Sequence, residues 1–228
     1  MSRVVSAVDL KIGYSSSSVL ASIDNLQIDK GEIVSIIGES GIGKTTLLRN
    51  IAKLQKPLDG ELLIFGSSSY PGRGDVGYIP QKLGLVKHET VYFNVLKGAI
   101  CHESIVKSIF GLHDQKVVDK VEESISLMKL IDKMDSPVKQ LSGGQQRRVA
   151  IARTMAQGAK LILADEFLSE LDDKTADNVW NVMHDYVKAN QITLIIVEHN
   201  IERAKLADRC FKLERSENSI SILVEVEK

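Results

Sequence analysis

Two short segments, far apart in the chain, hold the residue types whose spacing could do chemistry. The first, Gly38–Thr46, reads Gly-Glu-Ser-Gly-Ile-Gly-Lys-Thr-Thr and follows an apolar, β-branched run at Ile33–Ile37. The apolar residues after it have helical spacing: Leu47, Leu48, Ile51 and Leu54. A glycine loop between a strand and a helix can surround an anion with backbone N–H groups, and the helix start adds its own. The segment therefore predicts a phosphate-binding loop.

Individual residues of this loop have expected parts. Gly38, Gly41 and Gly43 let the backbone approach the anion closely, Lys44 would reach the β- and γ-phosphates of a nucleotide, and the Thr45 hydroxyl would bind Mg²⁺. The alternative, an ordinary glycine-rich turn with an exposed lysine, is disfavoured by the strand–loop–helix context. The expected nucleotide-binding residues of the loop are Gly38, Glu39, Ser40, Gly41, Ile42, Gly43, Lys44, Thr45 and Thr46.

The second segment, Leu141–Gln145, reads Leu-Ser-Gly-Gly-Gln. Ser142 followed three residues later by Gln145 predicts a capping box at a helix start. A cap alone does not explain Gly143 and Gly144, because glycine weakens a first helical turn. Two glycines behind a capping serine instead predict an exposed helix start that another body can approach, and so a second anion site.

Composition limits the kinds of protein this chain can be. Its 228 residues suit one well-packed domain, and 29 Lys and Arg against 30 Asp and Glu give a net charge of −1, so no surface for coating nucleic acid is expected. Cys101 and Cys210 lack metal-ligand spacing and are expected to be reduced thiols in the cytosol. No signal peptide or membrane-spanning stretch is recognisable, so we expect any membrane role to be by docking to another protein.

The N-terminal part predicts strands. Residues 4–12 and 19–28 alternate apolar and polar side chains around a serine loop, Ser15–Ser18, which predicts a hairpin. Ile33–Ile37 predicts a buried parallel strand, and further strands are expected at Glu61–Phe65 and Val76–Ile79.

From Thr90 to about Met134 the pattern becomes helical, and an α/β pattern then resumes. The apolar positions of the helical stretch are Val117, Val121, Ile125, Met128 and Ile131. Short apolar runs alternating with helices then predict a parallel sheet: Leu161–Ala164, Thr193–Val197 and Cys210–Leu213. A helix over 174–188 carries one apolar stripe of Ala176, Val179, Trp180, Met183 and Val187. The chain closes with a predicted hairpin whose turn is near Ser216–Ser219 and whose last strand is Ile220–Val226.

Leu141–Gln145 and the residues that follow it, Gln146–Arg153, resemble the signature motif and helix of ATP-binding cassette (ABC) ATPases. The resemblance covers essentially the whole chain, with every family motif in order. It implies a single α/β domain over 1–228: a P-loop NTPase core with a mostly parallel sheet and flanking helices, an N-terminal antiparallel β subdomain and an inserted α-helical subdomain. The core would comprise about 1–89 and 137–228, and the helical subdomain about 90–136.

The resemblance also implies catalytic and metal-binding roles. Asp165, at the end of an apolar strand, would belong to the Mg²⁺ shell with Thr45, and Glu166 would orient or deprotonate the attacking water. Gln81 resembles the glutamine that senses Mg²⁺, and His199 resembles the switch histidine on the γ-phosphate. The implied catalytic set is therefore Glu166, His199, Lys44 and Gln81, and the implied metal set is Thr45, Gln81 and Asp165.

Other family positions would act across a dimer or on the base. Leu141, Ser142, Gly143, Gly144 and Gln145 would contact the γ-phosphate held by a partner subunit, with Asp172 of the D-loop at the dimer seam. Tyr14 resembles the aromatic residue that stacks on adenine. Strand-end histidines and hairpin tyrosines are common without such roles, and the other histidines, His88, His102, His113 and His184, are expected at the surface.

Three residues depart from the family pattern. Phe167 stands where proline usually follows the catalytic glutamate, Glu170 stands where the D-loop commonly has a small residue, and Asn200 follows the switch histidine where aspartate is frequent. They put the turnover rate and the geometry of the dimer seam in doubt more than the reaction.

The function expected from this resemblance is ATP hydrolysis by the nucleotide-binding subunit of an ABC transporter. Within the family the chain resembles the phosphonate-importer subgroup, which suggests phosphonate or a related phosphorus oxyanion as cargo. The stretches that carry this are Gln81–Lys87, Asn94–Gly98, Ser104–Gly111 and Leu163–Glu166. The implied partners are a second copy in a head-to-tail homodimer, integral membrane permease subunits and, indirectly, a periplasmic or extracellular solute-binding protein, with no nucleic acid. The implied location is peripheral, at the cytoplasmic face of the membrane.

Other functional hypotheses stay open. An ABC exporter or lipoprotein-release ATPase shares several of the subgroup's features. A soluble, non-transport ABC ATPase would usually have coiled-coil inserts or two cassettes in one chain, and neither is here. A GTPase or small-molecule kinase would leave Leu141–Gln145 without a purpose, and the sequence has no NKxD motif for guanine.

Overall fold

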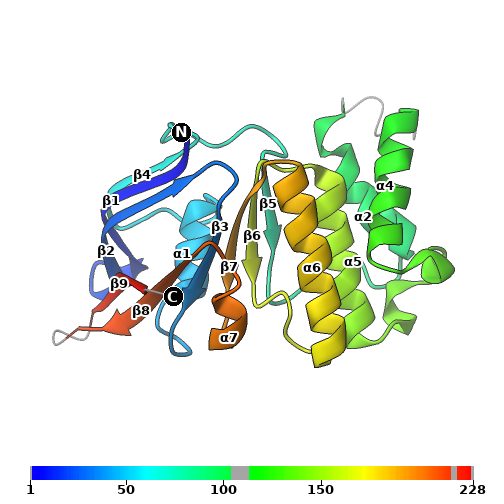
Figure 1. The fold of residues 1–228 in the computed structure, drawn as a ribbon. Coiled ribbons are helices and arrows are strands. Elements are labelled where there is room, and N and C mark those ends of the chain that lie inside the picture. The colour runs from blue at the N-terminus through cyan, green and yellow to red at the C-terminus, as the bar shows by residue number, and fades with distance from the viewer. Residues whose placement is uncertain (1, 104–112, 217–219, 227–228) are drawn as a thin grey trace. The chain divides into compact units, whose positions relative to one another are not determined.

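The computed structural model describes residues 2–103, 113–216 and 220–226 (Figure 1). The stretch Ser104–Gly111, which contributed to the subgroup resemblance, lies outside these residues, as does most of the expected turn at Ser216–Ser219. The chain divides into two compact units. One comprises Met1–Gly72, Leu161–Glu166 and Gln191–Lys228; the other comprises Arg73–Lys160 and Phe167–Asn190. A helical subdomain confined to 90–136 stays a prediction.

The first unit is built on a mixed sheet with strand order β4-β1-β2-β9-β8-β3-β7-β6 (Figure 1). Its strands are β1 Arg3–Ser15, β2 Ser18–Asp29, β3 Ile33–Ile37, β4 Asp59–Ile64, β6 Leu161–Asp165, β7 Thr193–Val197, β8 Arg209–Arg215 and β9 Ser221–Val226. β1 pairs antiparallel with β2 and β4, while β3 runs parallel to β7 and β8, and β7 runs parallel to β6. The predicted N-terminal hairpin and the buried parallel strands are therefore confirmed, and β8 and β9 pair antiparallel as the predicted C-terminal hairpin requires.

Burial explains which strands lie at the centre of this sheet. Every residue of β3, β6 and β7 is buried, as expected for apolar, β-branched strands covered on both faces. Helix α1, Lys44–Ile51, packs near β1 and β6, and short helix α7, Ile201–Ala204, packs near β3. The expectation that Leu54 continues the buried face of α1 is wrong. Lys53 has a left-handed backbone (φ 56°) that ends the helical path, and Leu54 is 66% exposed.

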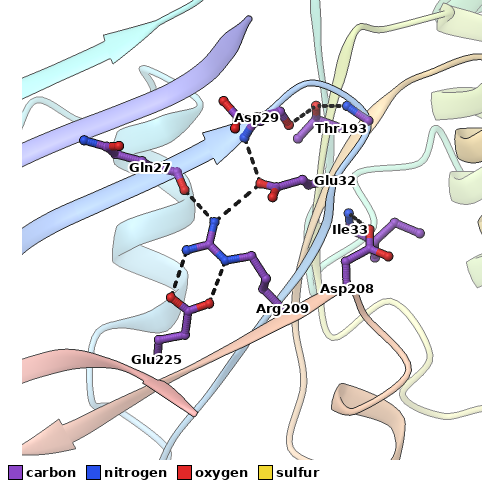
Figure 2. Close-up of polar contacts among 9 residues, drawn as sticks. Gln27, Asp29, Glu32, Ile33, Thr193, Asp208, Arg209 and Glu225 are labelled. Carbon is purple, nitrogen blue, oxygen red and sulfur yellow. Dashed lines mark hydrogen bonds and ion pairs between the residues drawn. The ribbon is translucent and has the colours of Figure 1, made fainter. Parts of the chain in front are cut away.

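A network centred on the Arg209 guanidinium joins three strands of the first unit and the residue before a fourth (Figure 2). Arg209 in β8 donates two hydrogen bonds to the Glu225 carboxylate of β9, from Nε at 2.6 Å and from Nη2 at 2.9 Å. Its Nη1 donates to the carbonyl of Gln27 in β2 at 2.8 Å and lies 3.5 Å from Glu32 Oε2, just before β3. The planar guanidinium of Arg209 thus binds the Glu225 carboxylate in a bidentate manner, with two parallel hydrogen bonds. This bidentate pair fixes the C-terminal strand against the middle of the sheet.

The second unit is mainly helical. Its elements are β5 Val76–Ile79, α2 Val91–Ala99, η1 Ile100–His102, α4 Gln115–Leu127, η2 Ile131–Lys133, η3 Val138–Gln140, α5 Gly143–Gln157 and α6 Asp173–Ala189. Helices α2, α4 and α5 pack against one another, and the Tyr186 hydroxyl of α6 donates to the Met155 carbonyl of α5 at 2.8 Å. The five-residue stripe of α6 is buried as expected, with the Trp180 ring centroid 6.4 Å from that of Phe167.

Two expectations about this unit are corrected. Ile131 does not continue the buried stripe of α4, because Lys129 has φ 54° and turns the chain, leaving Ile131 60% exposed. His113 is not a surface residue: its side chain is 16% exposed and its Nδ1 lies 2.7 Å from Glu103 Oε2. Cys101 and Cys210 are free thiols. Among the described helices, none is both long and apolar enough to cross a bilayer.

The contact between α2 and α5 yields a stability prediction at Gly98. A Cβ on Gly98 would lie 2.0 Å from the Arg153 carbonyl oxygen of α5. Glycine-to-alanine changes in open helical positions stabilise by roughly 1 kcal/mol, whereas overpacking costs about 1–3 kcal/mol. We expect Gly98→Ala to lower the free energy of unfolding by about 1–3 kcal/mol, measured by urea denaturation, with Ser126→Ala on α4 as the control. A stabilised Gly98→Ala would contradict this packing.

Candidate active site

The predicted phosphate loop connects β3 to α1 and has a backbone that only glycine adopts readily. Gly38, Gly41 and Gly43 have φ of 151°, 76° and 116°. A Cβ on Gly38 would lie 2.6 Å from the Leu213 carbonyl, whereas Gly41 faces open space. Gly43 is the N-cap of α1 and has no side chain that could accept a hydrogen bond from the first N–H groups of the helix. The loop therefore offers backbone donors and the positive end of the helix dipole to an anion.

Lys44 points back over this loop. Its Nζ donates to the carbonyls of Gly38 at 2.7 Å and Glu39 at 2.8 Å, and the residue is only 5% exposed. Burial lowers the pKa of Lys44, while the carboxylates of Glu166 and Asp165 act in the opposite direction. The ammonium thus lies against the loop and is attracted by Asp165, the last residue of β6, and by Glu166, which follows it.

Asp165 ends β6 as a buried carboxylate. It is 1% exposed, and among the described residues neither oxygen has a partner in hydrogen-bond geometry. Burial raises the pKa of Asp165, and the nearby Thr45 hydroxyl opposes this only in part. A buried carboxylate without a donor is costly unless a cation neutralises it. The oxygen donors of Asp165 and Thr45 are ligands that Mg²⁺ prefers, so these residues fit such an ion.

Glu166 and His199 form a close pair. Nε2 of His199 lies 2.7 Å from Oε1 of Glu166, with the side chains 47% and 19% exposed. The Glu166 backbone is left-handed (φ 53°), and its N–H donates to the Val197 carbonyl at 3.1 Å. A left-handed non-glycine residue costs conformational energy and is typically found where function requires it. The strained turn places the carboxylate beside an imidazole at the solvent-facing end of the sheet.

Glu198, directly before His199, is a residue that sequence reasoning missed. It is 6% exposed, its N–H donates to the Ile36 carbonyl, and its Oε1 has no partner among the described residues. Burial raises the pKa of Glu198 to about 7, Arg203 lowers it and Glu166 raises it. The only signal in the sequence was an acid directly after the apolar run Leu194–Val197.

The signature segment begins α5 in the second unit. Ser142 Oγ accepts from the Gln145 N–H at 3.3 Å, and the Ser142 N–H donates to Gln145 Oε1 at 2.9 Å. The predicted capping box is confirmed. Leu141 is buried, while Ser142 and Gly143 are exposed. The turn is therefore accessible, as the two glycines suggested.

The D-loop follows β6 and leads into α6. Asp172 caps α6, since its Oδ1 accepts from the Thr175 N–H at 3.0 Å, and its pKa is lowered by hydrogen bonds from the Thr175 side chain and backbone. This capping role was not anticipated from the sequence. Glu170 has φ 65°, and its Oε2 lies 3.7 Å from Nη2 of the buried Arg147.

Gln81 and Tyr14 are exposed and belong to different units. Gln81 follows β5 in the second unit, in a loop that other side chains hold. Arg153 donates to the carbonyls of Leu83 and Gly84. The Asn94 side-chain amide accepts from the Val86 N–H and donates to the Val86 carbonyl. Tyr14, near the end of β1 in the first unit, is 71% exposed, and its stacking on adenine stays a prediction.

The residues with expected roles fall into two groups. The first unit brings together Lys44, Asp165, Glu166 and His199. The residues Gln81, Ser142–Gln145 and Asp172 belong to the second unit.

Residues 22–169 match the family described as ABC transporter. The chain belongs to the ABC transporter family.

Curated relatives agree with this membership. The chain is 40% identical over 203 residues to the "Phosphonates import ATP-binding protein PhnC" of Lactobacillus gasseri, covering 84% of this chain and 77% of that protein. It is 40% identical over 189 residues to "Phosphonates import ATP-binding protein PhnC 1" of Halalkalibacterium halodurans, covering 79% and 74%.

Solved structures agree as well. A dimeric ATP-binding cassette in a post-hydrolysis state, bound to ADP and phosphate, superposes with a TM-score of 0.80 at 25% identity, over 98% of this chain and 99% of that one. The expected α/β fold of an ABC ATPase is thereby confirmed. Phe167, the first of the three residues that depart from the expected family pattern, is fully buried and packs beside Trp180.

Glu198 makes stability depend on pH. Burial raises the pKa of the Glu198 carboxyl to about 7 in the folded chain, against its ordinary value of 4.5 in the unfolded chain. Between these values the unfolded chain has lost this proton and the folded chain keeps it, so stability falls as pH rises through the window. We expect Glu198→Gln to match the parent near pH 4 and to be more stable by up to about 3 kcal/mol at pH 8, measured by urea denaturation. The exposed Glu202→Gln serves as control, and equal stability of Glu198→Gln and parent at pH 8 would contradict the buried carboxyl.

Proposed function

We propose that this chain is the ATP-hydrolysing, nucleotide-binding subunit of an ABC importer and that phosphonate or a related phosphorus oxyanion is the cargo. The single observation that carries the proposal is the convergence, in one unit, of a glycine phosphate loop with Lys44, the buried Asp165 beside the Thr45 hydroxyl, and the Glu166–His199 pair. The ABC family and the names of the relatives add the transport context.

Binding of the triphosphate falls to the loop and Lys44. The N–H groups of the loop and the start of α1 face an anion, and Lys44 exchanges its bonds to the Gly38 and Glu39 carbonyls for phosphate oxygens. Thr45 and Asp165 would hold Mg²⁺, with Gln81 as a further proposed ligand, and the ion would neutralise charge on the β- and γ-phosphates. Tyr14 would cover the adenine ring.

Hydrolysis falls to the Glu166–His199 pair. Glu166 is placed to orient the attacking water and accept its proton, because its carboxylate is fixed at a strained turn beside His199. His199 in turn would donate to the γ-phosphate. Since phosphoryl transfer needs little covalent help, positioning and charge stabilisation carry most of the catalysis.

The composite site would form only in a head-to-tail homodimer. The exposed turn at Ser142–Gly144 presents the N-terminus of α5 to a γ-phosphate held by the partner, and Asp172 would lie at the seam. ATP would then close the dimer and hydrolysis would release it. The dimeric form of the related cassette with ADP and phosphate supports this arrangement.

Transport partners follow from the proposed function. Permease subunits in the membrane would take up the motion of the dimer, a solute-binding protein would deliver the cargo to them, and the chain would sit peripherally at the cytoplasmic face. Export or lipoprotein release is the alternative. Co-purification of a polytopic membrane protein tests the partnership. Loss of growth on a phosphonate as sole phosphorus source, with growth on phosphate retained, tests the cargo.

Lys44→Ala tests the phosphate loop. Removing the ammonium should weaken ATP binding by at least about tenfold, since charge-assisted bonds to phosphate are worth about 1.5–3 kcal/mol. Binding of a fluorescent ATP analogue measures the effect. Lys205→Ala, which removes an exposed lysine from the same unit, is the matched control. Equal affinity of the Lys44 variant and the parent would count against the loop.

Glu166→Gln tests the catalytic assignment. The variant keeps the shape of the side chain but not its basicity, so ATP should still bind, hydrolysis should fall by about 10²-fold or more, and an ATP-dependent dimer should accumulate. Phosphate release and size-exclusion chromatography measure the two effects. Unimpaired turnover would refute the role of Glu166.

A further inference from the structure

Glu170 lies against the turn Ser142–Gly144 at the start of α5 in its own chain. A Cβ on Gly143 would be 3.5 Å from Glu170 Oε2, and one on Gly144 would be 3.8 Å from the Glu170 carbonyl and 3.0 Å from Leu171 Cδ2. The two glycines therefore do more than open the helix start to a partner. They also let the D-loop pack against it, which brings the Glu170 carboxylate to the first turn of α5.

The charge of this carboxylate is only partly balanced. Arg147, one turn further along α5 and 1% exposed, has its Nη2 3.7 Å from Glu170 Oε2, which is an ion-pair distance but too long for a strong hydrogen bond. The Glu170 side chain is 67% exposed. The Glu170 backbone is left-handed (φ 65°), a conformation that residues other than glycine adopt at an energetic cost. The negative charge is thus held at an accessible place.

A helix N-terminus has a limited positive potential, equivalent to about half an elementary charge. The Glu170 carboxylate already neutralises part of this positive potential at the start of α5. A triphosphate brought to the same turn by a partner subunit would meet that potential diminished and a like charge nearby. The D-loop of the wider family, with a small residue at this position, would offer no such opposition.

We infer that Glu170 acts as an electrostatic restraint on ATP-driven dimer closure, opposing the approach of the partner's γ-phosphate to Ser142–Gly144. The inference rests on the proposed function and goes beyond it, because it assigns a role to a residue that departs from the family pattern. The Glu170 charge raises the ATP concentration at which the dimer closes. It does not alter the binding of ATP to the phosphate loop of a single subunit.

The sign of the effect separates this role from a structural one. If the Arg147 pair merely held the D-loop in place, Glu170→Gln would weaken the dimer. If the charge opposes closure, Glu170→Gln strengthens it, and Glu170→Asp, which keeps the charge, stays close to the parent.

The experiment measures ATP-dependent dimerisation of the full chain in the Glu166→Gln background by analytical ultracentrifugation. Adding Glu170→Gln should lower the ATP concentration for half-maximal dimerisation by about two- to fivefold at about 50 mM salt, with most of the gain lost at about 500 mM. Glu122→Gln on α4, which removes the same charge from an exposed site, should have no effect. ATP affinity at protein concentrations too low for dimerisation should be unchanged.

A weakened or unchanged dimer in the Glu170→Gln variant, or a gain of equal size in Glu122→Gln, would overturn the inference while leaving the proposed function intact. Failure of the Glu166→Gln parent itself to dimerise with ATP would contradict the proposed function and the inference together.

Discussion

The first unit's chemistry depends on parallel strands that end level with one another. Val197 of β7 pairs with Ile36 of β3 on one side and with Asp165 of β6 on the other. The residues that follow these strands therefore emerge at one edge of the sheet. Neither a hydrophobic core nor a glycine loop alone would bring a lysine, two acids and a histidine together; the shared register of three fully buried strands does so.

Burial then sets the properties of the groups at this edge. Asp165 and Glu198 both leave apolar strands, and burial raises the pKa of each. They differ in surroundings: Asp165 lies beside the Thr45 hydroxyl, an oxygen donor that suits a cation, whereas Glu198 lies near Arg203 and Glu166. Two carboxyl groups at the ends of neighbouring parallel strands thus have different properties because of what the fold packs against them.

Patterns of residue type predicted the strands, the helix stripes and the motif loops, because apolar spacing and glycine placement act locally. Helix ends were harder. Leu54 and Ile131 fitted the helical spacing, but Lys53 and Lys129 take left-handed backbones that no propensity favours. Contacts between distant segments were out of reach: the pairing of Arg147 with Glu170 depends on how α5 meets the D-loop. Asp172 as a helix cap could have been read from the sequence.

The position of β9 has a consequence for how the chain is made. The N-terminal hairpin of β1 and β2 joins the rest of the sheet through β9, which lies between β2 and β8 and is fixed there by Arg209. On the ribosome, the first two strands emerge long before their neighbour does. One edge of this hairpin must remain unpaired until Ser221–Val226 has been synthesised, so the sheet is completed late, through contacts of large sequence separation.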